Sequence, residues 1–229
     1  AAADDAVPSS ARERPELEDA RVYINGLLSG RAFIKSGTAY LALADIGEMY
    51  GVDIRTDVTA DGFTASAPGL ELSAARDAGY AEANFRYIYL PRGYIVCGDD
   101  VYLPLDAIER IFSLTGELTD KGTVEISTTQ VRMISGNEDY YTTHFSADEL
   151  YWLPHIAYVE ALEEPLAGIM GVVSVVLNRV EDDDFPDTIF EVLYDRRTAV
   201  QFTPAATGSM HGKPTELYYI ATYLVLEGY

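Results

Sequence analysis

The chain has 229 residues, 48% of them hydrophobic, which is enough for one large folded domain or two smaller ones. Its 16 basic and 37 acidic residues give a net charge of −21, which argues against nucleic-acid binding and against adhesion to anionic membranes or wall polymers by charge alone. A single cysteine, Cys97, excludes an intrachain disulfide framework, and three scattered histidines exclude the usual zinc spacings, so we expect no metal ion and no cofactor.

Residues 1–19 are rich in alanine, proline and charge, and we expect a mobile N-terminal arm there. The opening stretch, AAADDAVPSS, is typical of what remains after cleavage at a small-residue site. This predicts a secreted protein whose signal peptide has been removed. A remnant of recombinant expression is the alternative.

A repeat with an offset of 62 residues organises residues 20–128. The stretches GTAYLALADIGEMYGV (37–52) and DDVYLPLDAIERIFSL (99–114) share a Tyr-Leu pair and then a leucine and an isoleucine at matching positions. In each copy we expect a short strand that leads into a helix. Asp45 or Asp106 lies near the helix start, where a carboxylate can cap free backbone N–H groups.

Turn signals predict hairpins around this repeat. Asn25-Gly26 follows an alternating stretch and predicts a hairpin before the first copy, while Asp61-Gly62 and Lys121-Gly122 predict one hairpin after each helix. Two copies of a β-α-β-β unit, placed side by side, predict one small α+β domain.

The repeat resembles the copper amine oxidase N-terminal-like domain, whose hallmark is a Gly-x-x-Tyr-hydrophobic-Pro-hydrophobic stretch that leads into a helix. The resemblance covers residues 20–128; the second copy keeps the proline as Pro104, and the first has Ala42. This part of the sequence contains no histidine, so we predict no copper despite the family name. The resemblance implies a non-catalytic partner of an exported enzyme, which orients the protein or binds the wall or a regulatory partner.

Residues 129–145 have little periodicity and predict a linker, and residues 146–229 predict a mainly helical domain. The stretch Ser146–Glu149 is a capping-box pattern that begins a helix. Pro154 either kinks this helix or lies in the first turn of a second helix that runs to Glu164. We favour the second interpretation.

The apolar run from Leu166 to Val180 predicts a helix that is apolar on almost all sides and forms the buried centre of its domain. Its core, Ala167–Leu177, is too short and too rich in glycine for a membrane span. A short amphipathic helix over 188–194 and a final helix over 214–228 complete the expected elements.

Glu160 is the candidate for a catalytic carboxyl group. On a helix, Ile156, Glu160 and Glu164 share a face, and the neighbouring positions are largely apolar. Partial desolvation, together with nearby Glu163 and Glu164, would raise the pKa of the Glu160 carboxyl. A carboxylic acid that stays protonated near neutral pH can donate its proton to a glycosidic oxygen. From the spacing alone, however, a solvated or helix-capping glutamate is the more common outcome.

The stretch from His155 to Met210 resembles the cell wall hydrolases of the spore-cortex-lytic (SleB) type. That family reads Tyr-Ala-Glu-Ala-Arg-Gly-Glu-Pro, then a small-and-apolar helix that ends Val-Leu-Asn-Arg-Val, then Phe-Pro-x-Thr, a tyrosine and Gln-Phe-Ser/Thr-Pro. The matching residues are Tyr158, Glu160, Ala161, Glu164, Pro165, Val176, Leu177, Asn178, Arg179, Val180, Phe185, Pro186, Thr188, Tyr194, Gln201, Phe202, Thr203 and Pro204. Leu162-Glu163 stands where the family usually has Arg-Gly.

This resemblance implies a lysozyme-like, resuscitation-promoting-factor-like α+β fold that acts on peptidoglycan glycan strands in the cell wall. It carries the catalytic role onto Glu160. The implied reaction is cleavage of the β-1,4 bond between N-acetylmuramic acid and N-acetylglucosamine by a lytic transglycosylase route, which needs only one carboxyl group. Tyr158, Gln201, Phe202 and Thr203 are the expected substrate-binding residues; packing is the alternative for Tyr158, and a structural turn for residues 201–203.

Two rival functions remain. The first is a non-catalytic wall-binding protein with a degenerate site, which is indicated by Leu162-Glu163 in place of the usual Arg-Gly. An amidase that cuts the stem peptide usually needs zinc or an activated cysteine, and the sequence suggests neither. Tyr151 and Trp152 are either sugar platforms or part of an interdomain contact.

Overall fold

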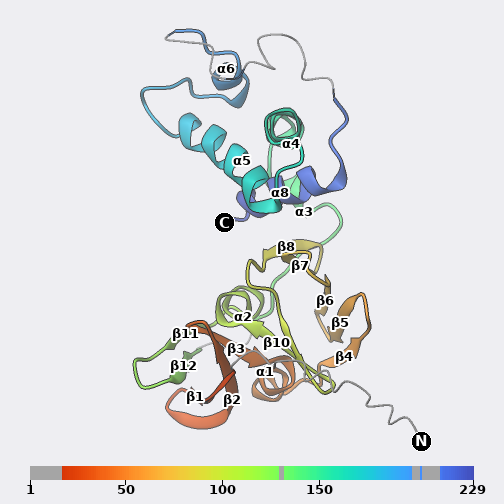
Figure 1. The fold of residues 1–229 in the computed structure, drawn as a ribbon, viewed down its shortest axis with the longest axis vertical. Helices are drawn as coiled ribbons and strands as arrows, with labels where there is room; N and C mark the ends of the chain where they lie inside the picture. The colour runs from red at the N-terminus through yellow and green to blue at the C-terminus, as the bar shows by residue number, and fades with distance from the viewer. Residues whose placement is uncertain (1–16, 129–131, 198–201, 203–211) are drawn as a thin grey trace, which may run out of the picture.

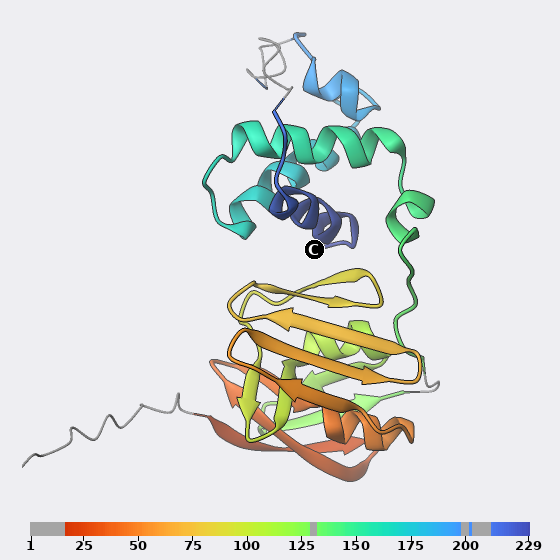
Figure 2. The ribbon, with the colours of Figure 1, turned by 90° about the vertical axis from the view of Figure 1, so that its right-hand side faces the viewer.

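The computed structural model describes residues 17–128, 132–197, 202 and 212–229. A strand-rich N-terminal region (residues 17–128) lies at one end of the molecule, and a helical C-terminal region (residues 132–229) lies at the other (Figures 1 and 2). The predicted mixed α+β class is therefore confirmed.

One sheet of the N-terminal region has seven strands in the order β11-β12-β1-β2-β3-β10-β9. These strands are β1 (Glu18–Ile24), β2 (Leu27–Lys35), β3 (Thr38–Ala42), β9 (Ile95–Cys97), β10 (Asp100–Pro104), β11 (Thr115–Leu118) and β12 (Thr123–Ser127). Asn25 and Gly26 join β1 to β2 with φ angles of 48° and 83°, as a tight hairpin turn requires. Strand β1 also pairs in parallel with β12, so the two ends of this region lie side by side.

The other sheet has five antiparallel strands in the order β4-β5-β6-β7-β8. They are β4 (Arg55–Val58), β5 (Gly62–Ala67), β6 (Leu70–Ala75), β7 (Tyr80–Ala83) and β8 (Arg86–Tyr89). The two hairpins of the sequence repeat thus have different partners: β4–β5 belongs to this sheet, whereas β11–β12 belongs to the seven-stranded one.

The helices of the repeat, α1 (Leu43–Tyr50) and α2 (Leu105–Phe112), follow the paired strands β3 and β10. The Tyr50 hydroxyl donates a hydrogen bond to the Phe112 carbonyl, and the two rings lie 5.4 Å apart, so equivalent positions of the repeat meet in the core. The expected aspartate caps are only partly present. Asp106 accepts from the Ala107 N–H, whereas Asp45 accepts from the Arg31 N–H of a neighbouring strand.

The C-terminal region contains five described helices: α3 (Tyr140–His144), α4 (Ala147–Glu160), α5 (Leu166–Val180), α6 (Ile189–Leu193) and α8 (Glu216–Leu226). Ser146 and Glu149 form the predicted capping box at the start of α4. Helix α3 lies within the stretch that we expected to be a linker. Ile134, in the same stretch, is buried against the N-terminal core.

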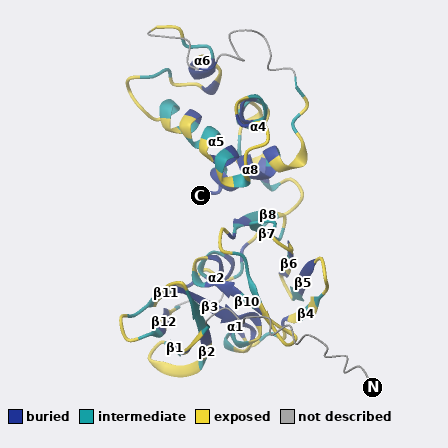
Figure 3. Ribbon diagram, viewed as in Figure 1, coloured by how far each residue is buried: buried dark blue, intermediate teal, exposed yellow. Residues whose placement is uncertain are grey.

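Two helix predictions were wrong. Helix α4 continues through Pro154, which is buried, so tertiary packing outweighs the backbone hydrogen bond that proline cannot donate. Helix α5 is not buried on all sides: Ile169 and Val173 belong to the core, but Val175 is 45% exposed. Figure 3 shows buried, intermediate and exposed stretches along this helix. Because α4, α6 and α8 together leave part of α5 uncovered, its apolar composition did not indicate how much of it would be enclosed.

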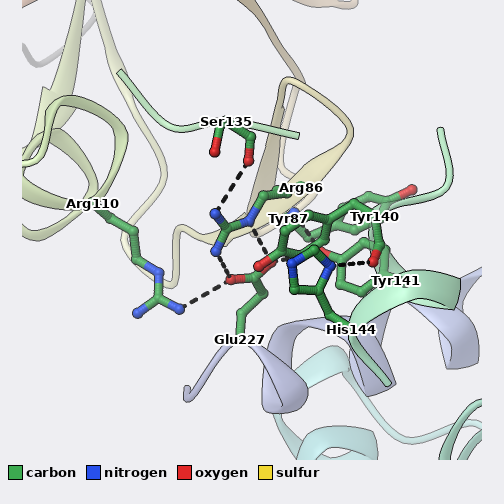
Figure 4. Close-up of polar contacts among 8 residues, drawn as sticks. All are labelled: Arg86, Tyr87, Arg110, Ser135, Tyr140, Tyr141, His144 and Glu227. Carbon is green, nitrogen blue, oxygen red and sulfur yellow. Dashed lines mark hydrogen bonds and ion pairs between the residues drawn. The ribbon is translucent and has the colours of Figure 1, made fainter. Parts of the chain in front are cut away.

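Buried hydrophobic side chains form two clusters, one within residues 20–134 and one within residues 153–225. A charged and aromatic contact joins the two regions (Figure 4). Glu227, which is 7% exposed, accepts from Arg86 Nε at 2.8 Å and Arg86 Nη2 at 2.5 Å, from Arg110 Nη2 at 3.2 Å and from the Tyr141 hydroxyl at 3.2 Å. The Tyr141 ring stacks on Tyr223 of α8 at 4.0 Å. The end of α8 is therefore tied to β8 and α2 of the N-terminal region.

Candidate functional site

Glu160 is the last residue of α4, and Ala161 caps the helix. The residue as a whole is exposed, yet the partial loss of hydration around its carboxyl group raises the pKa above the ordinary glutamate value. No hydrogen bond or ion pair joins it to another residue of the described part of the chain. The carbonyl end of a helix also disfavours an anion. This is an accessible acid that holds its proton more strongly than a free glutamate.

Tyr158 lies two residues before Glu160 and points into the packing between α4 and α8. Its ring meets Tyr218 edge-on, with centroids 5.2 Å apart. The backbone of Gly212 lies against the same ring, so closely that a Cβ at position 212 would clash with it. Half-buried Tyr158 has a packing role in this arrangement, and it makes no hydrogen bond to Glu160.

Tyr218 is a positioning residue that the sequence analysis missed. It is 6% exposed, and its hydroxyl donates to the carbonyl of Ala161 at 3.4 Å. The start of α8 thereby holds the end of α4 that carries Glu160. The sequence offered no signal for this contact, because 57 residues separate the two partners.

The turn between α4 and α5 has a backbone conformation that favours glycine at a position where this sequence has glutamate. Glu163 has a φ of 65°, a left-handed conformation that glycine adopts without strain and glutamate does not. Leu162 beside it is 62% exposed, and the Glu164 side chain folds over Gly168. The family's Arg-Gly would replace an exposed leucine with a cation and relieve the backbone strain.

Phe202 is buried, at 6% exposed, and Arg179 places its guanidinium 5.1 Å from the ring centroid. Substrate binding by Phe202 stays a prediction, and in this structure the core and Arg179 surround its ring. The neighbouring candidates Gln201 and Thr203 lie outside the described residues.

Helix α6 lies on the far side of the helical region from the N-terminal sheets (Figure 1), and its aromatic side chains pack against α4. Trp152 of α4 packs against Phe190 and Tyr194 of α6, with ring centroids 5.5 Å and 6.2 Å away. Tyr151, 47% exposed, stacks on His155 at 4.3 Å. The interdomain alternative for Tyr151 and Trp152 was therefore wrong.

The described residues contain no group of three or more histidine, cysteine, aspartate or glutamate side chains that could hold a metal ion. Within the same residue ranges, no helix is long and apolar enough to cross a membrane.

Comparison with known proteins gives a consistent likeness for the C-terminal region. Residues 163–229 match the family model described as Cell Wall Hydrolase, a match that begins just after Glu160. A spore cortex-lytic enzyme of Bacillus cereus is 32% identical over 72 residues, which cover 31% of this chain and 27% of that protein. The corresponding enzyme of Halalkalibacterium halodurans is 30% identical over 84 residues, covering 37% and 24%.

A solved structure, the catalytic domain of the germination-specific lytic transglycosylase SleB from Bacillus anthracis, is 29% identical, with a TM-score of 0.33. The match covers 38% of this chain and 68% of that domain. This chain spans about a quarter of the length of the curated relatives named above, at 27% and 24%. Residues 163–229 are thus similar to a cell wall hydrolase domain.

Proposed function

We propose that the C-terminal region is a peptidoglycan lytic enzyme in which Glu160 is the general acid and base. The observation that carries this proposal is the accessible Glu160 carboxyl with its raised pKa, placed at the helix end that leads directly into the cell wall hydrolase match. The substrate would be the β-1,4 bond between N-acetylmuramic acid and N-acetylglucosamine.

The reaction needs one carboxyl group. Protonated Glu160 donates its proton to the glycosidic oxygen while the bond from that oxygen to the muramic acid C1 breaks. The resulting carboxylate then takes the proton of the muramic acid C6 hydroxyl as the C6 oxygen bonds to C1. The product is a 1,6-anhydro sugar, and Glu160 ends the cycle protonated. Unlike the two-carboxylate hydrolases, this route uses a single carboxyl group.

Other parts of the proposal concern binding. Gln201 and Thr203 are proposed to bind the sugar chain, Gln201 through its amide to an acetamido group, with Tyr158 beside them. Tyr151 and Phe190, 47% and 46% exposed, would serve as an outer platform for sugar rings. Neutral sugars suit such a surface, since the chain's charge of −21 opposes binding of anions.

We also propose that the two regions are separate domains of a secreted protein that acts at the cell wall. The two buried clusters support this division. The N-terminal region would correspond to the copper amine oxidase N-terminal-like domain and act as a non-catalytic unit that orients the enzyme or binds a wall or regulatory partner.

The test compares digestion of purified peptidoglycan by the wild type, by Glu160→Gln and by a matched control, Glu163→Gln. We expect Glu160→Gln to lower turnover by about 10²–10⁴-fold and the control to retain activity. Mass spectrometry of the products should show 1,6-anhydro ends; reducing ends would indicate hydrolysis, and freed peptides an amidase.

A second candidate, a non-catalytic wall-binding protein, is favoured by the exposure of Glu160 and by Leu162 and Glu163. If the wild type binds peptidoglycan but releases no products, and Glu160→Gln binds equally well, the enzymatic proposal fails. A Leu162→Arg/Glu163→Gly variant that gains activity would then identify the degenerate turn as the cause.

A further inference from the structure

A cavity of about 360 Å³ on the N-terminal region gathers positive charge in an otherwise acidic chain. Lys35 at the end of β2, Arg76 after β6 and Arg92 after β8 all line it. The remaining lining residues are Val58, Asp77, Gly93, Tyr94 and Val96. Three cations against one carboxylate leave a local excess of two positive charges, opposite in sign to the chain as a whole.

None of these three cations forms an ion pair with a carboxylate of the described residues. Ion pairs among the described residues join Arg55, Arg86, Arg110 and Arg197 to carboxylates, but they include none of the three cavity cations. Arg76 donates to the carbonyls of Ala60 and Thr59, at 2.6 Å and 3.4 Å, and Arg92 donates to the Thr38 hydroxyl at 2.6 Å. Neutral acceptors hold the guanidinium groups in place and leave their charge for a ligand.

The cavity walls are fixed by the core behind them. The Tyr40 hydroxyl, from a side chain that is 1% exposed, donates to the Arg92 carbonyl at 3.1 Å. The Tyr94 ring packs edge-on against Phe63 at 4.7 Å. A site built before the ligand arrives loses less free energy on binding than one that must be ordered by it.

We propose that this cavity binds a phosphate-type oxyanion. Guanidinium groups match the geometry of phosphate oxygens, and an ammonium group adds a flexible point charge. Free phosphate and a phosphate group carried by a wall polymer share this chemistry. Such a site would let a chain of charge −21 dock on an anionic surface at one defined point, although its overall field opposes the approach. The proposal does not depend on the lytic activity.

The first test is calorimetric titration of the full chain with inorganic phosphate at constant ionic strength, with acetate as the carboxylate comparison. We expect saturable binding of phosphate that is tighter than binding of acetate. When the titration is repeated at higher salt, the binding of phosphate should weaken. Lys35→Gln should raise Kd about tenfold, because a charge-assisted contact is lost. Lys121→Gln removes the same charge from the exposed β11–β12 turn and should leave Kd unchanged, while Lys35→Arg should restore binding.

Absence of saturable phosphate binding, equal weakening in Lys35→Gln and Lys121→Gln, or equal affinity for acetate would overturn the proposal. Arg76→Gln, checked for native circular dichroism, gives a second variant from a different strand end. Pull-down with a phosphate-bearing wall polymer before and after removal of its phosphate separates the polymer from the free ion as ligand. Glu160→Gln should bind phosphate like the wild type, so failure of this site and failure of the lytic proposal are distinguishable.

Discussion

The two regions of the molecule bury their hydrophobic side chains in different ways. The N-terminal region closes two sheets and two helices around one core, through strand pairs as distant as β1 and β12. In the C-terminal region, the helices pack without enclosing one another completely. Part of α5 is therefore exposed, and Glu160 lies at an accessible helix end. The N-terminal region is thus the more enclosed of the two, and the Glu227 contact is a charged link between them.

Breaking that contact should have a large effect, similar in size to a core truncation. Glu227→Ala leaves Arg86 and Arg110 without their shared carboxylate, and we expect a loss of about 3 kcal/mol in the free energy of unfolding. This loss of stability is at the low end of the range for breaking a buried ion pair, because the Arg110 side chain is 33% exposed. Urea denaturation measures it, with Glu125→Ala, an exposed strand position, as control. A loss no greater than the control would mean that the contact is incidental.

Core truncations in each region should show whether the regions unfold together. Leu103→Ala in β10 and Ile169→Ala in α5 each remove a side chain that is 0% exposed, and each should cost about 2–5 kcal/mol. In calorimetry of the otherwise wild-type chain, we expect each substitution to lower the temperature of a single unfolding transition that both regions share. In the Glu227→Ala background each should lower only the transition of its own region. Two transitions already present in the wild type would contradict the coupling.

A smaller effect should come from the α4–α5 turn. Glu163→Gly removes the cost of a left-handed glutamate but adds freedom to the unfolded chain, for a net gain of about 0.5–1 kcal/mol. Glu164→Gly, at a position without positive φ, should destabilise instead. Thermal unfolding of the two variants measures the contrast, and destabilisation by both would show that the turn is not strained.

The smallest effect concerns the pH dependence of stability. The folded state raises the pKa of Glu160 above its model-compound value of 4.5 and therefore binds its proton more tightly than the unfolded state. The contribution of Glu160 to the stability of the folded state is complete below its ordinary pKa. This contribution is lost as the pH rises through the raised pKa of the folded state. Relative to the wild type, Glu160→Gln should gain stability as the pH rises above the ordinary glutamate pKa, modestly because the side chain is exposed. A pH-independent difference in melting temperature would count against the raised pKa.

Much of the local structure could be predicted from the sequence. The Asn25-Gly26 hairpin, the capping box from Ser146 to Glu149 and the span of α5 from Leu166 to Val180 follow the predicted positions. Each depends on residues close together in the chain, where turn geometry, capping and apolar content act directly. Glu160 as a partly desolvated acid was found in the same way.

The remaining features depend on partners far apart in the chain. Which sheet each repeat hairpin joins, how Glu227 meets Arg86 and Arg110, and how Tyr218 holds the end of α4 are all decided by tertiary packing. The same holds for the buried ring of Phe202 and the open face of α5. Amino-acid type determined where helices, turns and a candidate acid would form, because those preferences are local. Only the tertiary structure decided which surfaces are covered, because burial depends on residues that are distant in the sequence.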